Sequence, residues 1–334
     1  MRDFAVKFLQ FLILNRFLSV CGGLEGKEKF PYLIECLFEG IIPTSVSLVK
    51  MPCDHAENNM AILDIQPPDG IKKRFGVCSK RARFEDRNFA IKFIEWMHMM
   101  RILGAEKIHF FYDFVHPDTF EIFQYYGEQG ILETLEYLNP TGIENSATRS
   151  WQSNQVEVTI LTDCFFRVKN LYDYVAIVDM DEVIMPLIEE DMTWEDIIKR
   201  VDAKEHIDAY VFQNAYYPEV GAELIETIPS YMHMLQHVQR SKKITKPWES
   251  VKSFFNTGRV LTIHNHYPHH CLTNKKRKKC TRFAIPPNIS QSSHYRDKVD
   301  KDYRTTIEDS TIWKFKERLL KDVQNTLAAT KFAP

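Results

Sequence analysis

Three acidic residues, Asp179, Asp181 and Glu182, follow directly after the apolar run at residues 174–178. The run is short and rich in aliphatic and β-branched residues, which is typical of a strand covered on both faces. Ionised carboxylates beside such a strand are destabilising unless they meet solvent, a cation or a hydrogen-bond donor. Two carboxylates one residue apart at a strand end can turn toward one divalent cation, and their oxygen atoms suit Mn²⁺ or Mg²⁺ bridged to phosphate. The segment is therefore a candidate metal site.

The same acidic segment permits two other interpretations. The string VDMDEVI fits the nucleophile motif of haloacid dehalogenase phosphatases, with Asp179 as the nucleophile and Asp181 as the acid/base. That motif is expected near the start of its domain and ahead of a second acidic pair, whereas a long strand and helix pattern precedes it here. The phosphatase is therefore our second choice. A solvated acidic turn, with Asp179 as a helix N-cap, is the plain structural alternative.

Strand and helix patterns alternate before the acidic segment, and this rhythm predicts a parallel sheet. The predicted strands are residues 74–79, 107–113, 131–138 and 174–178, and the predicted helices are 85–104, 117–130 and one through 156–168. Further along, Thr193 and Asp196 predict a capping box that begins a helix. Strands at 209–217 and 259–267 and a last helix at 311–327 follow. Ligands of open α/β sheets bind outside the carboxyl ends of the strands, where Asp113 and the acidic segment fall.

The composition bounds the class of protein. Of 334 residues, 44% are hydrophobic and 13% aromatic, which suffices for a large core and excludes a disordered chain. The formal net charge is -2, so no overall field attracts nucleic acid or an anionic membrane. The basic run NKKRKK at 274–279 lacks interleaved aromatic residues, and we interpret it as a solvated loop rather than a nucleic-acid site.

The cysteines and the N-terminus are less informative. The seven cysteines include no C-x-x-C pair, so a structural zinc site is not expected, although Cys271 and Cys280 could close a loop. The apolar stretch within residues 4–21 is too short and too polar in its middle for a membrane span. It could be a weak signal or anchor helix, followed by a stem or accessory strands, or a buried helix. The turn-like segment at 64–70 suggests a domain boundary after residue 72, and the last helix suggests another after residue 300.

Five blocks of the sequence, in order over about residues 75–300, resemble the glycosyltransferase family 92 domain: IEWMHMMRILGAEKIHFFYD, ILETLEYLNP, TDCFFRVKNLYDYVAIVDMDEVIMP, KKITKPWESV and SSHYRDK. Several blocks in a fixed order are far more specific than an isolated D-x-D. The resemblance implies an α/β, GT-A-like Rossmannoid fold with a mostly parallel central sheet flanked by helices. It also implies inverting transfer of a sugar, characteristically galactose from UDP-galactose, to a glycan acceptor such as an N-glycan.

Members of that family are usually type II membrane proteins of the Golgi. The resemblance therefore implies the secretory pathway and membrane association through the N-terminus. A non-catalytic, glycan-binding relative of the transferases is the remaining alternative.

The resemblance also carries roles to individual residues. Asp179 and Asp181 match the family's metal-binding pair for Mn²⁺ or Mg²⁺, and His294 of the HYR string matches a late histidine that completes the metal shell. Glu182 takes the adjacent acidic position, where it would orient the loop or the donor. His264 and His266 compete with His294 for the third ligand position, because alternate residues of a continuing strand face the same side.

The end of the second predicted strand is assigned to donor binding. In such a fold Asp113 would hold the uridine or ribose and Tyr112 could stack on the base, with a helix N-cap as the plain alternative for Asp113. Inversion also requires a carboxylate that deprotonates the acceptor hydroxyl. Glu219 is the first residue to consider, but an exposed loop carboxylate is the commoner role, so no catalytic residue is assigned. Cys78 and Cys164 suit either a disulfide or two buried thiols.

Overall fold

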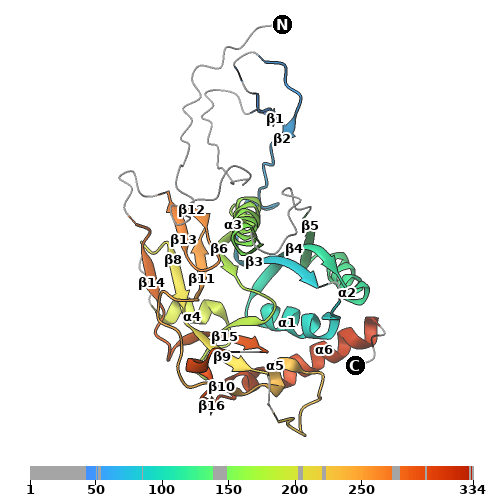
Figure 1. The fold of residues 1–334 in the computed structure, drawn as a ribbon, viewed down its shortest axis with the longest axis vertical. Coiled ribbons are helices and arrows are strands. Elements are labelled where there is room, and N and C mark those ends of the chain that lie inside the picture. Colours follow the sequence, from blue (N-terminus) through green and yellow to red (C-terminus); the bar gives the residue numbers. More distant parts are fainter. Residues whose placement is uncertain are drawn as a thin grey trace. The chain divides into compact units, whose positions relative to one another are not determined.

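The computed structural model describes residues 43–49, 51, 54–84, 86–137, 149–201, 206–219, 223–272, 279–297, 299–330 and 332. The chain divides into two compact units (Figure 1). In the first unit, residues 1–65 and 140–155, strand β1 (Ser45–Val46) pairs antiparallel with β2 (Met60–Ala61). The predicted helix at 4–21 and residues 274–278 of the basic run lie outside the described residues.

A seven-stranded sheet forms the centre of the second unit, residues 66–139 and 156–334. Its order is β14-β8-β11-β6-β3-β4-β5, in which β11 runs antiparallel to β6 and β8 and the other pairs are parallel. The strands are β3 (Lys73–Phe84), β4 (Ala105–Val115), β5 (Leu132–Glu136), β6 (Tyr172–Ile177), β8 (Ala209–Phe212), β11 (Lys252–Asn256) and β14 (Arg282–Ala284). The predicted α/β class with a mostly parallel central sheet is confirmed.

Both faces of the large sheet are buried. Along β6, Tyr174, Ala176 and Val178 belong to one apolar cluster, whereas Val175 and Ile177 belong to another. The first cluster includes α1 and α2, and the second includes α3. Alternate residues of a strand face opposite sides, so helices on both faces explain why the whole run is apolar.

The helices of this unit overlap the predicted ones, except for a short helix at 233–236 that was not predicted. They are α1 (Ala90–Ile102), α2 (Pro117–Glu128), α3 (Arg149–Val168), α4 (Trp194–Arg200), α5 (His233–Gln236) and α6 (Lys316–Thr330), with 3-10 turns at Lys301–Tyr303 and Thr311–Phe315. The capping box of Thr193 and Asp196 is present. Gly104, at φ 105°, follows the end of α1 as predicted. No helix among the described residues is both long and apolar enough to cross a membrane.

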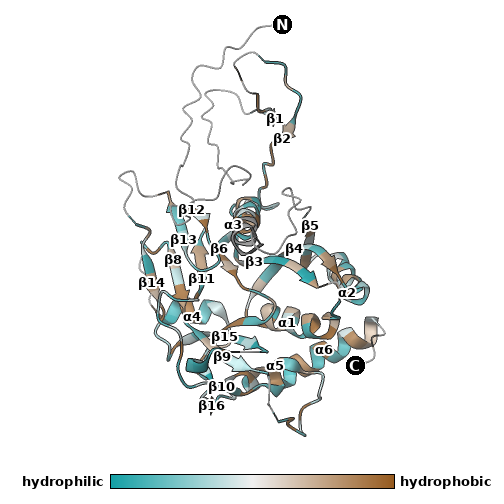
Figure 2. Cartoon of the chain, in the orientation of Figure 1, coloured by the Kyte–Doolittle hydropathy of each residue, from teal (hydrophilic) through white to brown (hydrophobic). Residues whose placement is uncertain are grey.

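The apolar stripe Phe89, Phe93, Met97 and Met100 predicts an amphipathic helix at residues 85–104, and α1 differs from this prediction. It begins at Ala90 rather than residue 85, and Asn88 accepts a hydrogen bond from the Ala90 amide. Hydrophobic residues predominate along it (Figure 2), and Ile94, Trp96 and Met99 are buried in addition to the predicted stripe. The cause is α6, which packs against α1 and contributes buried residues to the same cluster.

A three-stranded sheet, β7-β15-β9, lies beside the large one and receives the chain from it three times, after β6, β8 and β14. It contains β7 (Glu182–Pro186), β9 (Asn214–Pro218) and β15 (Ser290–Arg296). The predicted single strand 209–217 is wrong, because β8 and β9 belong to different sheets. At the break between the two strands, the Thr245 amide donates to the Asn214 carbonyl, and the Asn214 amide donates to the Thr245 hydroxyl. The side-chain amide of Gln213 donates to the Thr245 carbonyl.

The predicted strand 259–267 is shorter in the structure. Strand β12 (Val260–Ile263) pairs with β13 (Pro268–Cys271), and the His264 amide donates to the Tyr267 carbonyl in the turn between them. Strands β10 (Gln239–Ser241) and β16 (Thr306–Glu308) form a further pair.

Two disulfides join segments of the second unit. Cys78 of β3 is bonded to Cys164 of α3, and Cys271 is bonded to Cys280. The first bond links the sheet to a helix across 86 residues of sequence, and the second spans 9. Each bond restricts the unfolded chain, the longer loop more than the shorter one.

The disulfides should contribute unequally to stability. Replacing Cys78 and Cys164 together by Ala should lower the free energy of unfolding by about 4–5 kcal/mol, against about 2–3 kcal/mol for Cys271 and Cys280, because the loop entropy grows with length. Equilibrium urea denaturation of the two double variants measures both values. An equal or larger loss for the shorter loop would contradict this expectation.

Candidate active site

The acidic segment lies where the chain passes from the large sheet to the small one. Strand β6 ends at Ile177 and β7 begins at Glu182, so Asp179 and Asp181 occupy the connection. The Glu182 amide donates to the Asp179 carbonyl at 3.0 Å, and the Asp179 amide donates to Glu182 Oε2 at 3.1 Å. The indole of Trp96 donates to the Glu182 carbonyl at 3.0 Å. These bonds fix the turn.

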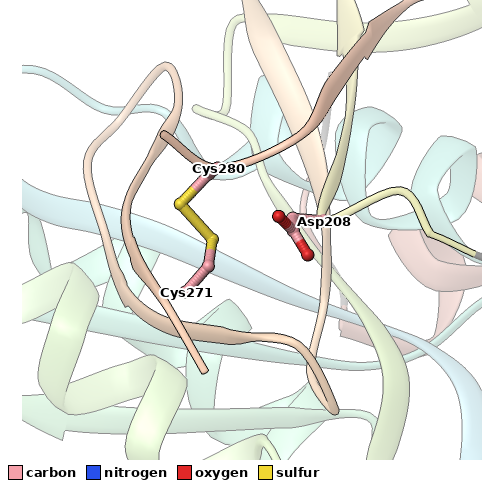
Figure 3. Close-up of side chains that lie close together, drawn as sticks. All are labelled: Asp208, Cys271 and Cys280. Atoms are coloured by element: carbon pink, nitrogen blue, oxygen red, sulfur yellow. A yellow bond between two sulfur atoms is a disulfide. The ribbon is translucent and has the colours of Figure 1, made fainter. Parts of the chain in front are cut away.

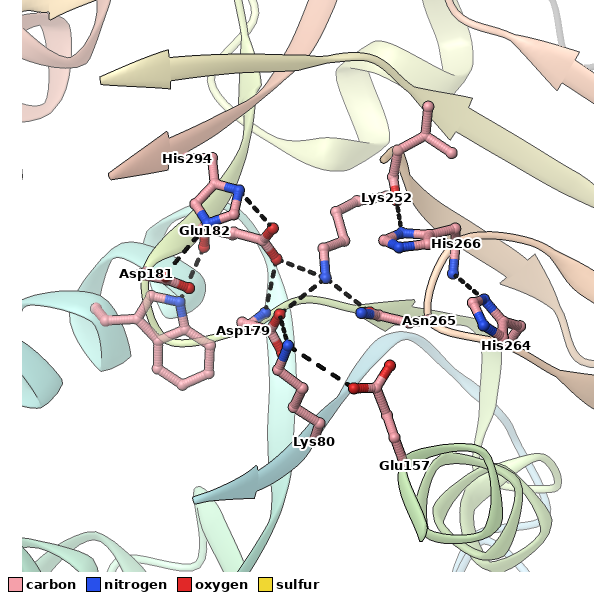
Figure 4. A network of polar contacts seen from close by, with 12 residues as sticks. Lys80, Glu157, Asp179, Asp181, Glu182, Lys252, His264, Asn265, His266 and His294 are labelled. Atoms are coloured by element: carbon pink, nitrogen blue, oxygen red, sulfur yellow. Dashed lines mark hydrogen bonds and ion pairs between the residues drawn. The ribbon is translucent and has the colours of Figure 1, made fainter. Parts of the chain in front are cut away.

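A buried ammonium group balances the carboxylates (Figure 4). Lys252, whose side chain is 1% exposed, places Nζ 3.0 Å from Asp179 Oδ2 and 2.6 Å from Glu182 Oε2. It also donates to Asn265 Oδ1 at 2.7 Å. Burying a charge is tolerated where it is paired and hydrogen-bonded, and this contact allows two carboxylates to sit at the end of a buried strand.

Lys80 is the second cation of this network. Its Nζ lies 2.9 Å from Asp179 Oδ2 and 3.9 Å from Glu157 Oε2. Burial alone would raise the pKa of Asp179, but the ammonium groups of Lys252 and Lys80 hold it well below its usual value. Burial would likewise lower the pKa of Lys252, and the carboxylates of Asp179 and Glu182 raise it instead. Asp179 and Lys252 are therefore charged at neutral pH.

His294 completes the acidic group from a neighbouring strand. It stands opposite Glu182 in the antiparallel pair β7-β15. Its Nδ1 lies 3.0 Å from Glu182 Oε1, and its Nε2 lies 3.2 Å from Asp181 Oδ2. Tyr216 of β9 stands next to His294 on the other side. The structure thus brings together Asp179, Asp181, Glu182 and His294, as the sequence predicted.

A cavity of about 690 Å³ opens over these residues. The side-chain oxygen atoms of Asp179, Asp181 and Glu182 that could hold a cation lie within 4.8 Å of one another. Asp179 Oδ1 is buried and has no hydrogen-bond partner in the described part of the chain, while the Asp181 side chain is 46% exposed. A buried carboxylate oxygen without a partner, beside an accessible carboxylate, fits a divalent cation with oxygen ligands.

Comparison with known families decides which proteins this chain is related to. Residues 73–330 match the model of Glycosyltransferase family 92. The chain belongs to this family. Membership of this family argues against the phosphatase alternative. The matched residues include the large sheet, the small sheet and the acidic segment between them.

One curated relative and several solved structures resemble this family 92 chain. A family 92 protein of Caenorhabditis elegans is 22% identical over 203 residues, which are 59% of this chain and 37% of the relative. The structure of S. aureus TarS in complex with UDP-GlcNAc is 10% identical, with TM-score 0.37, and the match covers 75% of this chain and 67% of that one. A mannosyltransferase from Pyrobaculum calidifontis in complex with GDP-Man and Mn2+ is 11% identical, with TM-score 0.35 and coverage of 81% and 79%. The family assignment rests on the family match and not on these structures.

The competing histidines of this family 92 chain lie in the β12-β13 turn. Because the strand ends at Ile263, the expected alternation of His264 and His266 along a strand does not occur. His264 stacks on Tyr267, and burial lowers its pKa to about 3. His266 lines the cavity and donates from Nδ1 to the Val251 carbonyl at 2.7 Å. The contacts with two carboxylates favour His294 as the third ligand.

Of the predicted donor residues, Glu182 lines the cavity, whereas Tyr112 and Asp113 lie outside its lining. Tyr112 packs against Phe120 and Phe123. Asp113 lies within β4, and its Oδ2 is 3.0 Å from Nη1 of Arg81, which does line the cavity. Their roles in donor binding stay predictions, and Asp113 could act by holding Arg81.

A second group of potential metal ligands, Asp208, Cys271 and Cys280, has another explanation (Figure 3). The two sulfur atoms are bonded to each other, so they offer no thiolate. Asp208 accepts from Arg259 Nε at 2.8 Å and from the Thr281 amide at 2.7 Å. This group is a structural one.

The sequence did not reveal the two lysines. Lys252 begins the strand β11, which was not predicted, and its signal is a single charge ahead of the apolar residues SFF. Lys80 follows the predicted strand 74–79, and its charge alone does not distinguish it from a surface lysine. Lys252 and Lys80 lie 73 and 99 positions from Asp179 in the sequence, so their contacts with it are visible only after folding.

Removing the buried ammonium should destabilise the protein strongly. Lys252→Met leaves Asp179 and Glu182 without their shared cation and should lower the free energy of unfolding by about 3–5 kcal/mol. Lys80→Met is the matched control, since its side chain is 41% exposed, and the loss should be smaller. Urea denaturation at neutral pH measures both, and equal losses would contradict the proposed role of Lys252.

Proposed function

We propose that this chain is a metal-dependent galactosyltransferase that moves galactose from UDP-galactose to a glycan acceptor, such as an N-glycan, with inversion. The observation that carries the proposal is the unpartnered, buried Asp179 Oδ1 beside the accessible Asp181 in one cavity. Membership of glycosyltransferase family 92 supports transfer of a sugar. The choice of galactose, the inversion and the acceptor follow from the family resemblance.

Asp179 and Asp181 would hold the cation, Mn²⁺ or Mg²⁺, with His294 as a third ligand. When bound, the cation supplies charge stabilisation for a leaving diphosphate. Glu182 contributes by orienting its neighbours, since its carboxylate contacts Lys252 and the imidazole of His294. Lys252 pairs with Asp179 through Oδ2 and leaves Asp179 Oδ1 without a partner among the described residues.

Lys80 is placed to meet the donor. Its side chain lines the cavity beside Asp179 and is 41% exposed. An ammonium group in such a position can pair with diphosphate oxygens. Tyr112 and Asp113 remain the predicted contacts of the uridine, the latter through Arg81.

We further propose that the protein works in the secretory pathway, at the Golgi, with membrane association through its N-terminus. The support is the family resemblance together with two disulfides, which persist mainly in oxidising compartments.

The metal site can be tested by substituting its accessible ligand. Asp181→Ala should weaken Mn²⁺-dependent binding of UDP by about 100-fold or more, because charge stabilisation by a cation is worth several kcal/mol. Titration calorimetry with UDP, with and without Mn²⁺, measures the effect. Asp163→Ala is the control, since Asp163 is 45% exposed, lies outside the cavity lining and should leave binding unchanged.

Two outcomes would overturn the proposal. Equal UDP affinity of the wild type and Asp181→Ala in Mn²⁺ would exclude the metal assignment. A wild-type protein that binds no UDP and transfers no galactose would exclude the transferase and favour a non-catalytic relative.

A further inference from the structure

A second carboxylate lines the same cavity at a distance from the acidic segment. Glu219 directly follows β9, and its side chain is 18% exposed. Its Oε1 lies 2.7 Å from His233 Nε2, and its Oε2 lies 3.1 Å from Lys92 Nζ. All three residues line the cavity. Glu219 is therefore held in the cavity wall and is not a freely moving loop residue.

The register of the small sheet places Glu219 relative to the proposed metal site. Tyr216 pairs with His294, and Glu219 follows three positions later, where its amide donates to the Arg296 carbonyl at 2.9 Å. At about 3.3 Å per strand residue, Glu219 lies about 10 Å along the strand from Tyr216. A sugar attached to a diphosphate that is held at Asp181 can lie between Asp181 and Glu219. Glu219 is then on the side of the sugar that faces away from the diphosphate.

Two consecutive residues of α1 support both ends of this cavity. Trp96 donates to the Glu182 carbonyl in the acidic segment. Glu95 is buried and accepts hydrogen bonds from the amides of Met234 at 2.9 Å and Leu235 at 3.3 Å. Those amides belong to α5, which begins at His233. Trp96 therefore fixes the acidic segment, and its neighbour Glu95 fixes α5, which carries His233, the partner of Glu219.

The protonation states suit a base. Burial, together with the nearby Lys92 and His237, lowers the pKa of His233 to about 2, so the ring is neutral at physiological pH. A carboxylate only accepts hydrogen bonds, so Nε2 carries the proton that His233 donates to Glu219. Burial and the neighbouring carboxyl group of Asp297 raise the pKa of Glu219, and Lys92 offsets this only in part. A base is most effective when its pKa approaches the working pH.

We infer that Glu219 is the catalytic base for the acceptor hydroxyl and that His233 is its positioning residue. The inference rests on the proposed function, since only an acceptor hydroxyl needs this base. The acceptor O–H bond breaks and its proton passes to Glu219, while the oxygen forms a bond to the anomeric carbon. The bond from that carbon to the diphosphate oxygen breaks, and its electron pair leaves with UDP. The proton on Glu219 is later released to solvent.

The first test separates chemistry from donor binding. Glu219→Gln keeps the size of the side chain but cannot take a proton, and it should lower kcat for transfer of labelled galactose from UDP-galactose to a pool of N-glycans by about 100- to 10,000-fold. Mn²⁺-dependent binding of UDP should be unchanged. Glu133→Gln is the matched control, because Glu133 also pairs with a histidine, His109, at 2.9 Å but lies outside the cavity lining.

The second test uses the pH profile of transfer. Lys92 lowers the pKa of Glu219, so Lys92→Met should raise it. The carboxylate then stays protonated to a higher pH, and the acidic limb of kcat/KM should move to higher pH. Lys199→Met, which removes an exposed lysine paired with Glu195, should leave the limb in place.

The positioning role of His233 has its own readout. His233→Ala should lower kcat without changing UDP binding, whereas His233→Gln, whose amide N–H can still donate to Glu219, should recover most of the lost rate. Equal losses in both variants would show that His233 does not act through this hydrogen bond.

The outcomes distinguish this inference from the proposed function. Wild-type transfer with an equally active Glu219→Gln variant, or an unmoved acidic limb in Lys92→Met, overturns the base and leaves the transferase intact. A wild type that neither binds UDP nor transfers galactose overturns both.

Discussion

The region around the acidic segment depends on one contact, the Lys252 ammonium buried between the carboxylates of Asp179 and Glu182. The direction of β11 makes this contact possible. Because β11 runs antiparallel to β6, with Ser253 opposite Ile177, its first residue lies beside the carboxyl end of β6. A parallel strand would have brought its last residue there. The single reversed direction within the large sheet thus delivers the cation that the acidic segment requires.

The need to give buried polar groups partners also determines how the surrounding elements pack. Buried polar groups need partners, and Trp96 of α1 and His294 of β15 contact the acidic segment directly. Asn265 of the β12-β13 turn acts at one remove, because it accepts a hydrogen bond from Lys252. Helix α1 is buried on most of its surface because it must face the large sheet, α5 and α6 together. The unusual burial of Glu95 has the same origin, and its two backbone hydrogen bonds to α5 compensate for it.

The sequence predicted local structure and chemistry well but not the partners that lie far away in the chain. The strands β3, β4 and β6 could be predicted because burial on both faces leaves a continuous apolar run, and the main helices could be predicted from their helical periodicity. The acidic pair is recognisable from its residue types after an apolar strand, whereas His294 was assigned from the family resemblance of the HYR string. Lys252 and His233 were missed, since a single lysine or histidine in an apolar segment has no local signature. The sequence also did not show that residues 209–217 divide between two sheets. Thr245, which hydrogen-bonds to the backbone of Asn214 at the break, lies 31 positions away in the sequence.

The passage of the chain between the two sheets has one more consequence. Asp179 and Lys252 are carried by the large sheet, whereas Glu182 and His294 are carried by the small one. The contact from Lys252 to Glu182 therefore fastens one sheet to the other through charge. Attachment of the small sheet and the geometry of the proposed metal site thus depend on the same contact, so a substitution in β7 or β15 that lets the sheets slide would disturb both together.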